Sequence, residues 1–376
     1  MQRIVIVGAG AAGLSLAYYL ATRSNGSDFD CVLIDPDDKT ENDRTWAFWG
    51  EPFEFDQLVS HRWERVSLRR GKCEVVRESG AYRYIRGDRF YAHCLGVIER
   101  DRRFDFVRGR VEYFEAKDEG VELIVRRRLA AKGGGYADPE RFAADYLIDS
   151  VFGPPGDPGH LKQSFVGWEV EVSPPVWNPE EATLMEFETA DSTFGLEFFY
   201  TLPLSPTRAL LEYTAVDTWI PEEGYLEDRL EEYLDDLAGG EWRVLRKEKG
   251  TIPLFENRGP RAGSRIAHLG VAAGAARPST GYAFREILEL SSRLADRLLE
   301  AAGTERSYED DGREPLLPEC AVPHRRGRPR FYDAVFLELL RRESQRMPEA
   351  LVSLFRGNPG ERVFRFLEGR SSLFDE

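Results

Sequence analysis

The first 35 residues constrain the fold more than any other part of the chain. An apolar run at 4–7 is followed at once by a glycine-rich turn of GxGxxG spacing at 8–13 and then by apolar residues at helical intervals. A second apolar run, 31–34, ends in Asp35, where a carboxylate can accept both hydroxyls of a ribose. This order of elements predicts a dinucleotide-binding βαβ unit, and hence an α/β protein: a strand, a glycine-rich turn, a helix, and a second strand with a terminal acid.

Each residue of the turn has a distinct role in this arrangement. Gly8 makes the tight turn, Gly10 lets a pyrophosphate approach the backbone at the positive helix end, and Gly13 allows the helix to pack closely on the strand. Ala11 and Ala12 belong to the same expected cofactor-binding turn. The motif does not separate FAD from NAD. Its place at the N-terminus, with later segments that return to the same sheet, favours FAD.

The middle of the chain predicts a second sheet. A buried strand at 146–150, which contains Asp149, returns to the first sheet, and the Pro/Gly-rich loop 153–159 marks a domain boundary. A helix is expected at 222–237. Between them lie four segments of β alternation, which predict an antiparallel sheet inserted into the nucleotide-binding domain: 165–173, 182–188, 195–204 and 208–215.

A second cofactor contact is expected near residue 280. A short strand, a glycine-containing loop and a helix with apolar residues on one face follow one another from 266 onwards. The N-terminus of that helix would face a polar edge of the cofactor, with Ser279 and Thr280 as capping residues. Ordinary helix punctuation is the alternative reading of this loop. The expected cofactor-binding residues here are Gly274, Pro278, Ser279, Thr280 and Gly281.

These patterns give a specific fold prediction. We expect a Rossmann-like FAD-binding domain of the glutathione-reductase/hydroxylase type at 1–155, rejoined by 250–310. The inserted antiparallel sheet, 156–249, would hold the substrate, and a helical C-terminal cap would cover 311–376.

Composition excludes several kinds of function. The net charge of −15 argues against a nucleic-acid partner, because duplex binding needs a basic footprint. The four cysteines form no CxxC pair and the five histidines no HxxxH pattern, so no metal site is predicted. A strand that begins near Met1 leaves no room for a signal peptide, and no apolar run reaches membrane-spanning length. We therefore expect a cytoplasmic protein.

The charge is distributed unevenly along the chain. Residues 321–370 carry 11 arginines against 6 acidic residues, with apolar residues at helical spacing. Basic amphipathic helices of this kind can lie on an anionic membrane surface. A helical cap over the core with a solvated arginine face is the alternative.

Several segments in order along the chain resemble the flavoprotein lycopene cyclases of carotenoid synthesis, specifically the bacterial β-cyclases. NDRTWAFW and ARPSTGYAF are the most specific of these strings. Arg44 and Thr45, in the first of them, are added to the expected cofactor-binding residues. The segments are NDRTWAFWG (42–50), YRYIRGDRFY (82–91), GWEVEV (167–172), EATLMEF (181–187), LPLSPTRALLEYT (202–214), RPSTGYAF (277–284) and LFRGNPGERVFRFLEG (354–369).

This resemblance implies a redox-neutral reaction. Such enzymes protonate an acyclic ψ-end of lycopene or a related carotene, let the carbocation close into a six-membered ring, and remove a proton to leave a β-ionone ring. It also implies reduced FAD as cofactor, with NAD(P)H as reductant. Because a C40 hydrocarbon must be drawn from a bilayer, we expect residues 321–370 to help dock the enzyme on a membrane. Other enzymes of the carotenoid pathway are further expected partners.

The resemblance also singles out an acid. Glu212, followed by Tyr213, matches the first glutamate of a family motif whose second glutamate is absent here. Protonating an alkene needs an acid in a dry pocket, where desolvation raises the carboxyl pKa. Without the resemblance, an acid on the solvated face of a sheet would be the favoured reading. Glu169 and Glu186 are second-rank acid or base candidates.

Aromatic faces stabilise carbocations, so we expect aromatic walls around the substrate. The candidates are Trp46, Trp49, Trp168 and Tyr213, although large aromatic residues are more often plain core. Two other functions share the same N-terminal fingerprint: a flavin monooxygenase or polyprenyl reductase acting on an isoprenoid lipid, and a flavin-bound, non-catalytic membrane-association protein.

Overall fold

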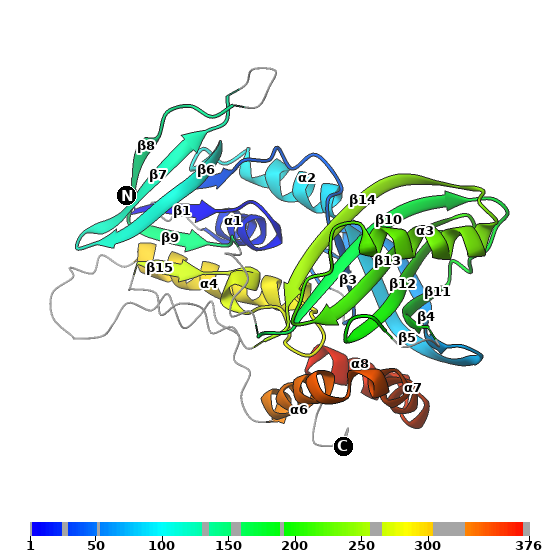
Figure 1. Cartoon of the computed structure of the whole chain (residues 1–376). Helices are drawn as coiled ribbons and strands as arrows, with labels where there is room; N and C mark the ends of the chain where they lie inside the picture. The colour runs from blue at the N-terminus through cyan, green and yellow to red at the C-terminus, as the bar shows by residue number, and fades with distance from the viewer. Residues whose placement is uncertain are drawn as a thin grey trace.

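The chain forms two sheets that lie side by side, with helices on their outer faces (Figure 1). The computed structural model describes residues 2–24, 29–50, 53–129, 135–151, 159–188, 192–255, 265–303 and 328–370.

The first sheet is the predicted nucleotide-binding sheet. Its order is β15-β9-β1-β2-β6-β7-β8; the first five strands are parallel, and β6, β7 and β8 form an antiparallel meander. Helices α1 (Ala11–Arg23), α2 (Gly87–Ile98) and α4 (Phe284–Gly303) share one apolar core on its face. The strands are β1 (Gln2–Val7), β2 (Phe29–Asp35), β6 (Phe104–Lys117), β7 (Gly120–Arg127), β8 (Glu140–Ala144), β9 (Tyr146–Asp149) and β15 (Ile266–His268).

The second sheet has eight strands in the order β14-β10-β13-β12-β11-β4-β5-β3. The four predicted segments are present as β10 to β13. Its strands are β3 (Thr45–Phe48), β4 (Val59–Arg70), β5 (Cys73–Arg86), β10 (Lys162–Val172), β11 (Glu181–Phe187), β12 (Leu196–Ser205), β13 (Arg208–Asp217) and β14 (Trp242–Pro253).

The domain boundaries differ from the prediction. Strands β3, β4 and β5 come from the first 155 residues yet complete the second sheet through a parallel pairing of β4 with β11. Strand β14 also continues past the predicted end at 249. The pairing of β4 with β11 joins residues more than a hundred positions apart, which no local pattern encodes. Most of the predicted boundary loop lies outside the described residues.

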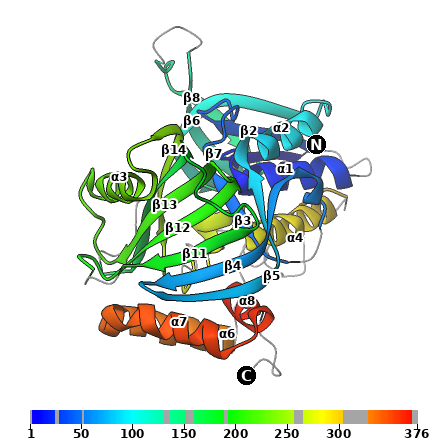
Figure 2. The ribbon, with the colours of Figure 1, turned by 90° about the vertical axis from the view of Figure 1, so that its right-hand side faces the viewer.

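Helices cover both faces of the second sheet. Helix α3 (Tyr225–Ala238), close to its predicted range, packs on one face through Leu226, Leu230 and Leu234. The C-terminal helices lie beneath the other part of the sheet, where α7 contacts β4 and α8 contacts β5 (Figure 2). They are α6 (Arg328–Glu343), α7 (Met347–Gly357) and α8 (Gly360–Glu368); 311–327 and 371–376 of the predicted cap lie outside the described residues.

Short 3-10 turns join several of these elements: η1 (Asp56–Leu58), η2 (Gly270–Ala273) and η3 (Ser344–Arg346). Among the helices described, none is both long enough and apolar enough to cross a membrane.

Candidate active site

The glycine-rich turn has the geometry that a bound dinucleotide needs. Gly8 has a φ of +91°, and its amide donates to the carbonyl of Ile34 at 2.8 Å. A Cβ on Gly13 would lie 1.9 Å from the Gly8 carbonyl oxygen, so only glycine lets α1 start this close to β1. A Cβ on Gly10 would meet nothing within 4 Å. The turn is therefore closed on the protein side and open above Gly10, where a pyrophosphate would lie against the helix N-terminus.

An acidic residue stands at the end of each of the two strands that flank β1, and hydrogen bonds hold it in place. Asp35 accepts hydrogen bonds from the amides of Ala9, at 2.7 Å, and Asp37, at 2.8 Å, and lies 3.3 Å from Lys39 Nζ. Asp149, at the end of β9, accepts from the amide of Val151 at 3.0 Å. Asp35 is thus held at the mouth of the turn, in the position predicted for the ribose acceptor.

Arg44 and Thr45 lie where the two sheets meet. Arg44 Nη1 donates to the carbonyl of Lys249 at 3.0 Å, and the Arg44 carbonyl accepts from the amide of Gly87. Thr45 Oγ1 accepts from Arg246 Nη2 at 3.2 Å. In this structure both residues connect β3 to β14.

The capping role predicted for Ser279 and Thr280 is wrong, because α4 begins only at Phe284. Ser279 Oγ donates to Asp333 Oδ1 of α6 at 2.5 Å, and Thr280 Oγ1 donates to the carbonyl of Leu367 at 3.2 Å. These hydroxyls therefore hold the loop against the C-terminal helices. The loop itself keeps two glycines of positive φ: Gly274, at +84°, and Gly281, at +72°.

Glu212 lies at the centre of the second sheet, buried at 9% exposure. Register places Gly167 of β10 and Tyr200 of β12 directly beside it, and Glu248 of β14 beyond Gly167. Residues paired in register point to the same face, so these four form one row across the sheet. Burial, followed by the charge of Glu248, raises the pKa of Glu212 well above its usual value, which favours the protonated form of this carboxyl.

Aromatic side chains continue this row. Tyr200 and Tyr82 have their hydroxyl oxygens 2.6 Å apart, and Tyr282 lies 3.5 Å from Tyr82. Burial raises the pKa of all three tyrosines, so their hydroxyls remain neutral hydrogen-bonding groups. Trp49 stacks on Tyr82 with ring centroids 4.2 Å apart. Glu212 therefore has an aromatic neighbourhood on the side away from Glu248.

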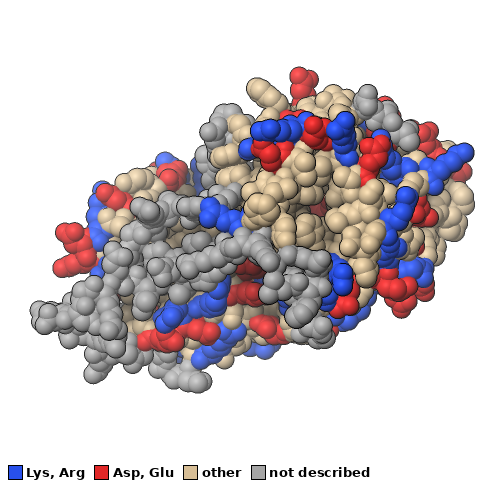
Figure 3. Space-filling view, turned by 90° about the horizontal axis from the view of Figure 1, so that it is seen from below, with Lys and Arg blue, Asp and Glu red and all other residues tan. Residues whose placement is uncertain are grey.

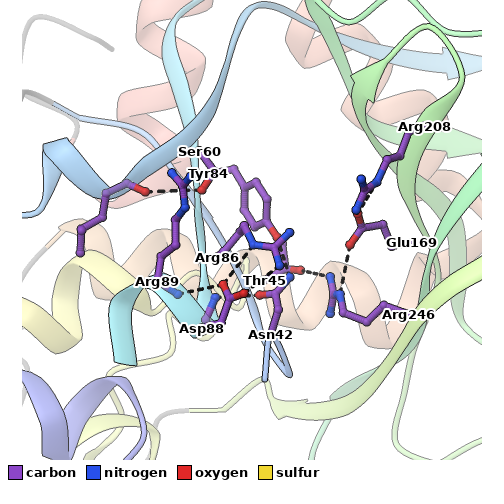
Figure 4. Close-up of polar contacts among 12 residues, drawn as sticks. Asn42, Thr45, Ser60, Tyr84, Arg86, Asp88, Arg89, Glu169, Arg208 and Arg246 are labelled. Carbon is purple, nitrogen blue, oxygen red and sulfur yellow. Dashed lines mark hydrogen bonds and ion pairs between the residues drawn. The ribbon is translucent and has the colours of Figure 1, made fainter. Parts of the chain in front are cut away.

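Glu169 belongs to the same face as an ion-paired carboxylate. Arg246 lies between Glu169, at 3.3 Å, and Glu248, at 2.7 Å, while Arg208 binds the far side of Glu169 at 2.7 Å. Figure 4 shows this chain of contacts, from Arg208 through Glu169 to Arg246 and on to Thr45. Glu169 is 2% exposed. A buried carboxylate that binds two arginines suits a positioning role better than that of a proton donor.

Three predicted site residues lie on the opposite face of this sheet, and their assignment beside Glu212 is corrected. Trp168 and Tyr213 alternate with the site residues along β10 and β13 and pack in the core under α3. Glu186 accepts a hydrogen bond from Tyr233 of α3 at 3.1 Å. In a strand, successive side chains point to opposite faces, so Tyr213 cannot share a pocket with its neighbour Glu212.

Trp46 lies in a different cluster, in the core of the first sheet. Its ring stacks on Phe284 with centroids 5.1 Å apart. Of the four predicted aromatic walls, Trp49 alone joins the aromatic neighbourhood of Glu212 described above. Sequence reasoning missed Glu248, Gly167 and the tyrosines, which become visible only once strand register is known.

A cavity of about 290 Å³ lies next to this neighbourhood, between β3, the start of α4 and the end of α8. Trp49 and Tyr282 line it together with Arg277, Arg285 and Glu368. Its lining is largely charged, which does not suit a hydrocarbon. Within the described ranges, no group of three or more His, Cys, Asp or Glu side chains is arranged to hold a metal ion.

Comparison with known proteins identifies the family. A family model described as "Lycopene cyclase protein" matches residues 3–376. The chain belongs to the lycopene cyclase family. A lycopene beta-cyclase of Paracoccus sp. is 27% identical over 387 residues, covering 99% of this chain and 92% of that protein. One from Pantoea ananas is 27% identical, covering 78% and 73% respectively.

Solved structures share the fold of this lycopene cyclase family member at low identity. A geranylgeranyl bacteriochlorophyll reductase-like protein of Thermoplasma acidophilum gives a TM-score of 0.66 at 11% identity, covering 99% of this chain and 92% of that one. A p-nitrophenol 4-monooxygenase of Pseudomonas putida gives 0.63 at 14% identity, with 99% and 100% coverage. A flavin-dependent brominase gives 0.65 at 12% identity, with 98% and 93% coverage. The predicted FAD-binding fold class is thereby confirmed.

Proposed function

We propose that this chain is a lycopene β-cyclase, which converts the ψ-ends of lycopene into β-ionone rings, first giving γ-carotene and then β-carotene. The observation that carries the proposal is Glu212, a buried carboxyl beside aromatic rings whose pKa is raised by burial, in a member of the lycopene cyclase family. An acid that protonates an alkene needs such dry surroundings.

The reaction balances as an isomerisation. Glu212 transfers its proton to the terminal double bond of a ψ-end, and the resulting carbocation is attacked by a second double bond, which closes the ring. Loss of a proton from a ring carbon beside the new cation leaves the β-ring double bond. One proton enters and one leaves, and no electrons are transferred. The ring of Tyr200, which lies beside Glu212 in register, can stabilise the cationic intermediates.

FAD fits the residues at the start of the chain. The open backbone at Gly10 would receive the pyrophosphate, and Asp35 would hold the ribose. When bound in its reduced form, the flavin would supply negative charge to the reaction without being consumed, and NAD(P)H is the proposed reductant.

Anaerobic turnover in heavy water tests this function. With reduced enzyme and lycopene in liposomes, we expect β-carotene that carries solvent deuterium, while the absorbance of reduced flavin stays constant. Mass spectrometry of the product and the flavin spectrum provide the two readings. A monooxygenase or polyprenyl reductase would oxidise the flavin in step with product, and that outcome would contradict the cyclase proposal.

Membrane docking is a second part of the proposed function. The helices of the C-terminal segment differ in how much of their apolar surface they expose, and so in whether they could contact a membrane. Helices α7 and α8 bury their apolar faces in the core, among them Leu351, Phe355 and Phe364, so they act as a cap. Helix α6 instead leaves Phe331, at 64%, and Leu339, at 44%, exposed to solvent.

We define the docking surface as the exposed apolar residues of α6 with the neighbouring turn after β13. Phe331, Val335 and Leu339 follow one another at four-residue intervals, and Trp219 is 75% exposed. Gln345, just after α6, donates to the carbonyl of Ser192, in the segment that leads into Gly195, whose amide binds Asp217 at the start of the turn. The turn therefore lies beside the end of α6.

The charged residues around the docking surface favour an anionic lipid membrane as its binding partner. Figure 3 shows an uncharged area on this side of the molecule, with Lys and Arg side chains along its margin together with Asp and Glu side chains. Exposed arginines on α6 and just after it include Arg330, Arg341, Arg342 and Arg346. Basic residues around an apolar stripe favour adsorption to anionic bilayers, and tryptophan favours the interface.

Replacing Phe331, Val335 and Leu339 together by Ser should reduce binding to phosphatidylglycerol-containing liposomes by about tenfold or more, because each apolar side chain contributes roughly 1–3 kcal/mol when buried in lipid. Co-sedimentation measures the effect. Tyr113→Ser, at an exposed site on β6 of the first sheet, is the matched control. Equal binding of the triple variant and the parent would contradict the docking surface.

A further inference from the structure

Gly167 creates a gap in the sheet between two carboxyl side chains. It lies in β10, between Glu212 of β13 and Glu248 of β14, and pairs with both in register. A Cβ at this position would lie 2.9 Å from Glu212 Cγ and 3.1 Å from Glu248 Cγ. Strands two apart in a sheet are separated by about 10 Å, so side chains from them meet only when the residue between leaves room. The missing side chain of Gly167 lets the two carboxyls lean over β10 toward each other.

The two oxygens of Glu248 have different surroundings. Oε2 accepts a hydrogen bond from Arg246 Nη1 at 2.7 Å. Oε1 is buried, and within the described part of the chain no donor reaches it. A buried carboxylate oxygen without a donor is costly, and a proton on the neighbouring Glu212 is a donor in the right place. Arg246 is the partner of Glu248 Oε2, so Glu212 is the carboxyl of the two that is placed to donate a proton to Oε1.

We propose that Glu248 is the positioning partner of Glu212, and that the two carboxyls share one proton, which Glu212 delivers to the substrate. The proposal rests on the cyclase function above and adds a residue to it. Two adjacent carboxyl groups cannot both ionise readily in a dry site, so one of them keeps its proton. When Glu212 has given its proton away, two negative charges face the new carbocation, and the pair is ready to be protonated again.

The surroundings of the pair support this role. Burial and the neighbouring Glu248 raise the pKa of Glu212, and Arg246 opposes that rise. From β12 and β5, Tyr200 and Tyr82 face the same region as neutral hydroxyls, as does Tyr282. Glu169 is held by Arg208 and Arg246. Glu248 is therefore the one carboxylate of this row placed to set how strongly Glu212 retains its proton.

The test compares Glu248→Gln with the parent across the pH range, using the full chain with reduced FAD. Removing the charge of Glu248 should move the alkaline limit of kcat/KM to lower pH by about one unit or more. Glu248→Asp, which restores the charge, should return the limit toward that of the parent. Glu171→Gln, on the neighbouring strand β10 with an exposed ion pair to Arg243 of β14, is the control and should leave the profile unchanged. A slower Glu248→Gln enzyme with an unmoved pH profile would overturn the proposal.

A second measurement needs no substrate, and so separates this proposal from the cyclase function. The infrared spectrum of the parent at neutral pH should contain the C=O band of a buried protonated carboxyl. The band should be lost in Glu212→Gln and displaced in Glu248→Gln. Bands that are identical in the parent and Glu248→Gln would show that the two carboxyls do not share a proton, whether or not the enzyme cyclises lycopene.

Discussion

Replacing Glu212 by Gln should reduce lycopene cyclisation by about 100- to 10,000-fold, the usual contribution of a general acid. Gln has nearly the same shape as Glu and can still donate to the free oxygen of Glu248, so the site should keep its packing. The change removes only the transferable proton. Initial rates of β-carotene formation, measured by chromatography with liposome-bound lycopene, give the effect directly.

Two controls show whether chemistry alone has been lost. Flavin content and lycopene binding of Glu212→Gln should match those of the parent. Glu171→Gln, the same chemical change in an exposed ion pair, should keep full activity. If Glu212→Gln retained more than about a tenth of the parent rate, Glu212 would not be the proton donor.

Relative to the parent, Glu212→Gln should become more stable as the pH rises above the range in which an ordinary carboxyl titrates. The pKa of Glu212 is raised in the folded protein, from 4.5 to well above it, so the folded state holds more protons than the unfolded state in that interval. Stability contributed by this group is therefore present below pH 4.5 and is lost as the pH rises through the raised pKa. Gln does not titrate, so Tm of Glu212→Gln should fall less between acid and alkaline pH. Parallel Tm curves for the two proteins would contradict the raised pKa.

Local patterns predicted much of the fold because its elements are local. The turn at Gly8, the strand before Asp149 and the helix 222–237 all have signatures within a few residues, and each is present. The addition of β4 and β5 to the second sheet was not predicted, because the pairing of β4 with β11 depends on contacts distant in sequence and β5 joins the sheet through β4. The helix predicted after Thr280 starts later than expected, since the preceding residues bind the C-terminal helices instead.

The sequence pointed to a residue of the candidate site only where a family motif contained that residue. Glu212 was found through its motif, but its partner Glu248 lies between two lysines in a polar strand and looks like a solvated acid. Only the register across β10 brings the two together, with Gly167 between them. Successive side chains of a strand point to opposite faces, which is why Tyr213, although it follows Glu212, packs in the core under α3 instead of beside it.

Gly13→Ala should prevent formation of a flavin-binding protein, whereas Gly10→Ala should fold and lose only flavin affinity. A methyl group on Gly13 would lie 1.9 Å from a backbone oxygen of Gly8, so α1 must move away from β1. Forced overpacking of this kind costs about 1–3 kcal/mol or more, and the strand-to-helix geometry that binds the pyrophosphate is lost with it. The methyl of Gly10→Ala meets no protein atom within 4 Å and would occupy the space left for the pyrophosphate.

Thermal unfolding of the apoproteins and flavin titration separate the two effects. Gly10→Ala should unfold at the Tm of the parent and bind FAD at least about tenfold more weakly, because the phosphates can no longer approach the backbone closely. Gly13→Ala should lower Tm even without flavin. Gly96→Ala, in the last turn of α2 with nothing within 4 Å of its new Cβ, should leave FAD affinity unchanged and should not lower Tm, because alanine favours a helix over glycine. If Gly10→Ala bound FAD as tightly as the parent, the open space above this turn would not be the pyrophosphate site, and the proposed cofactor position would be wrong.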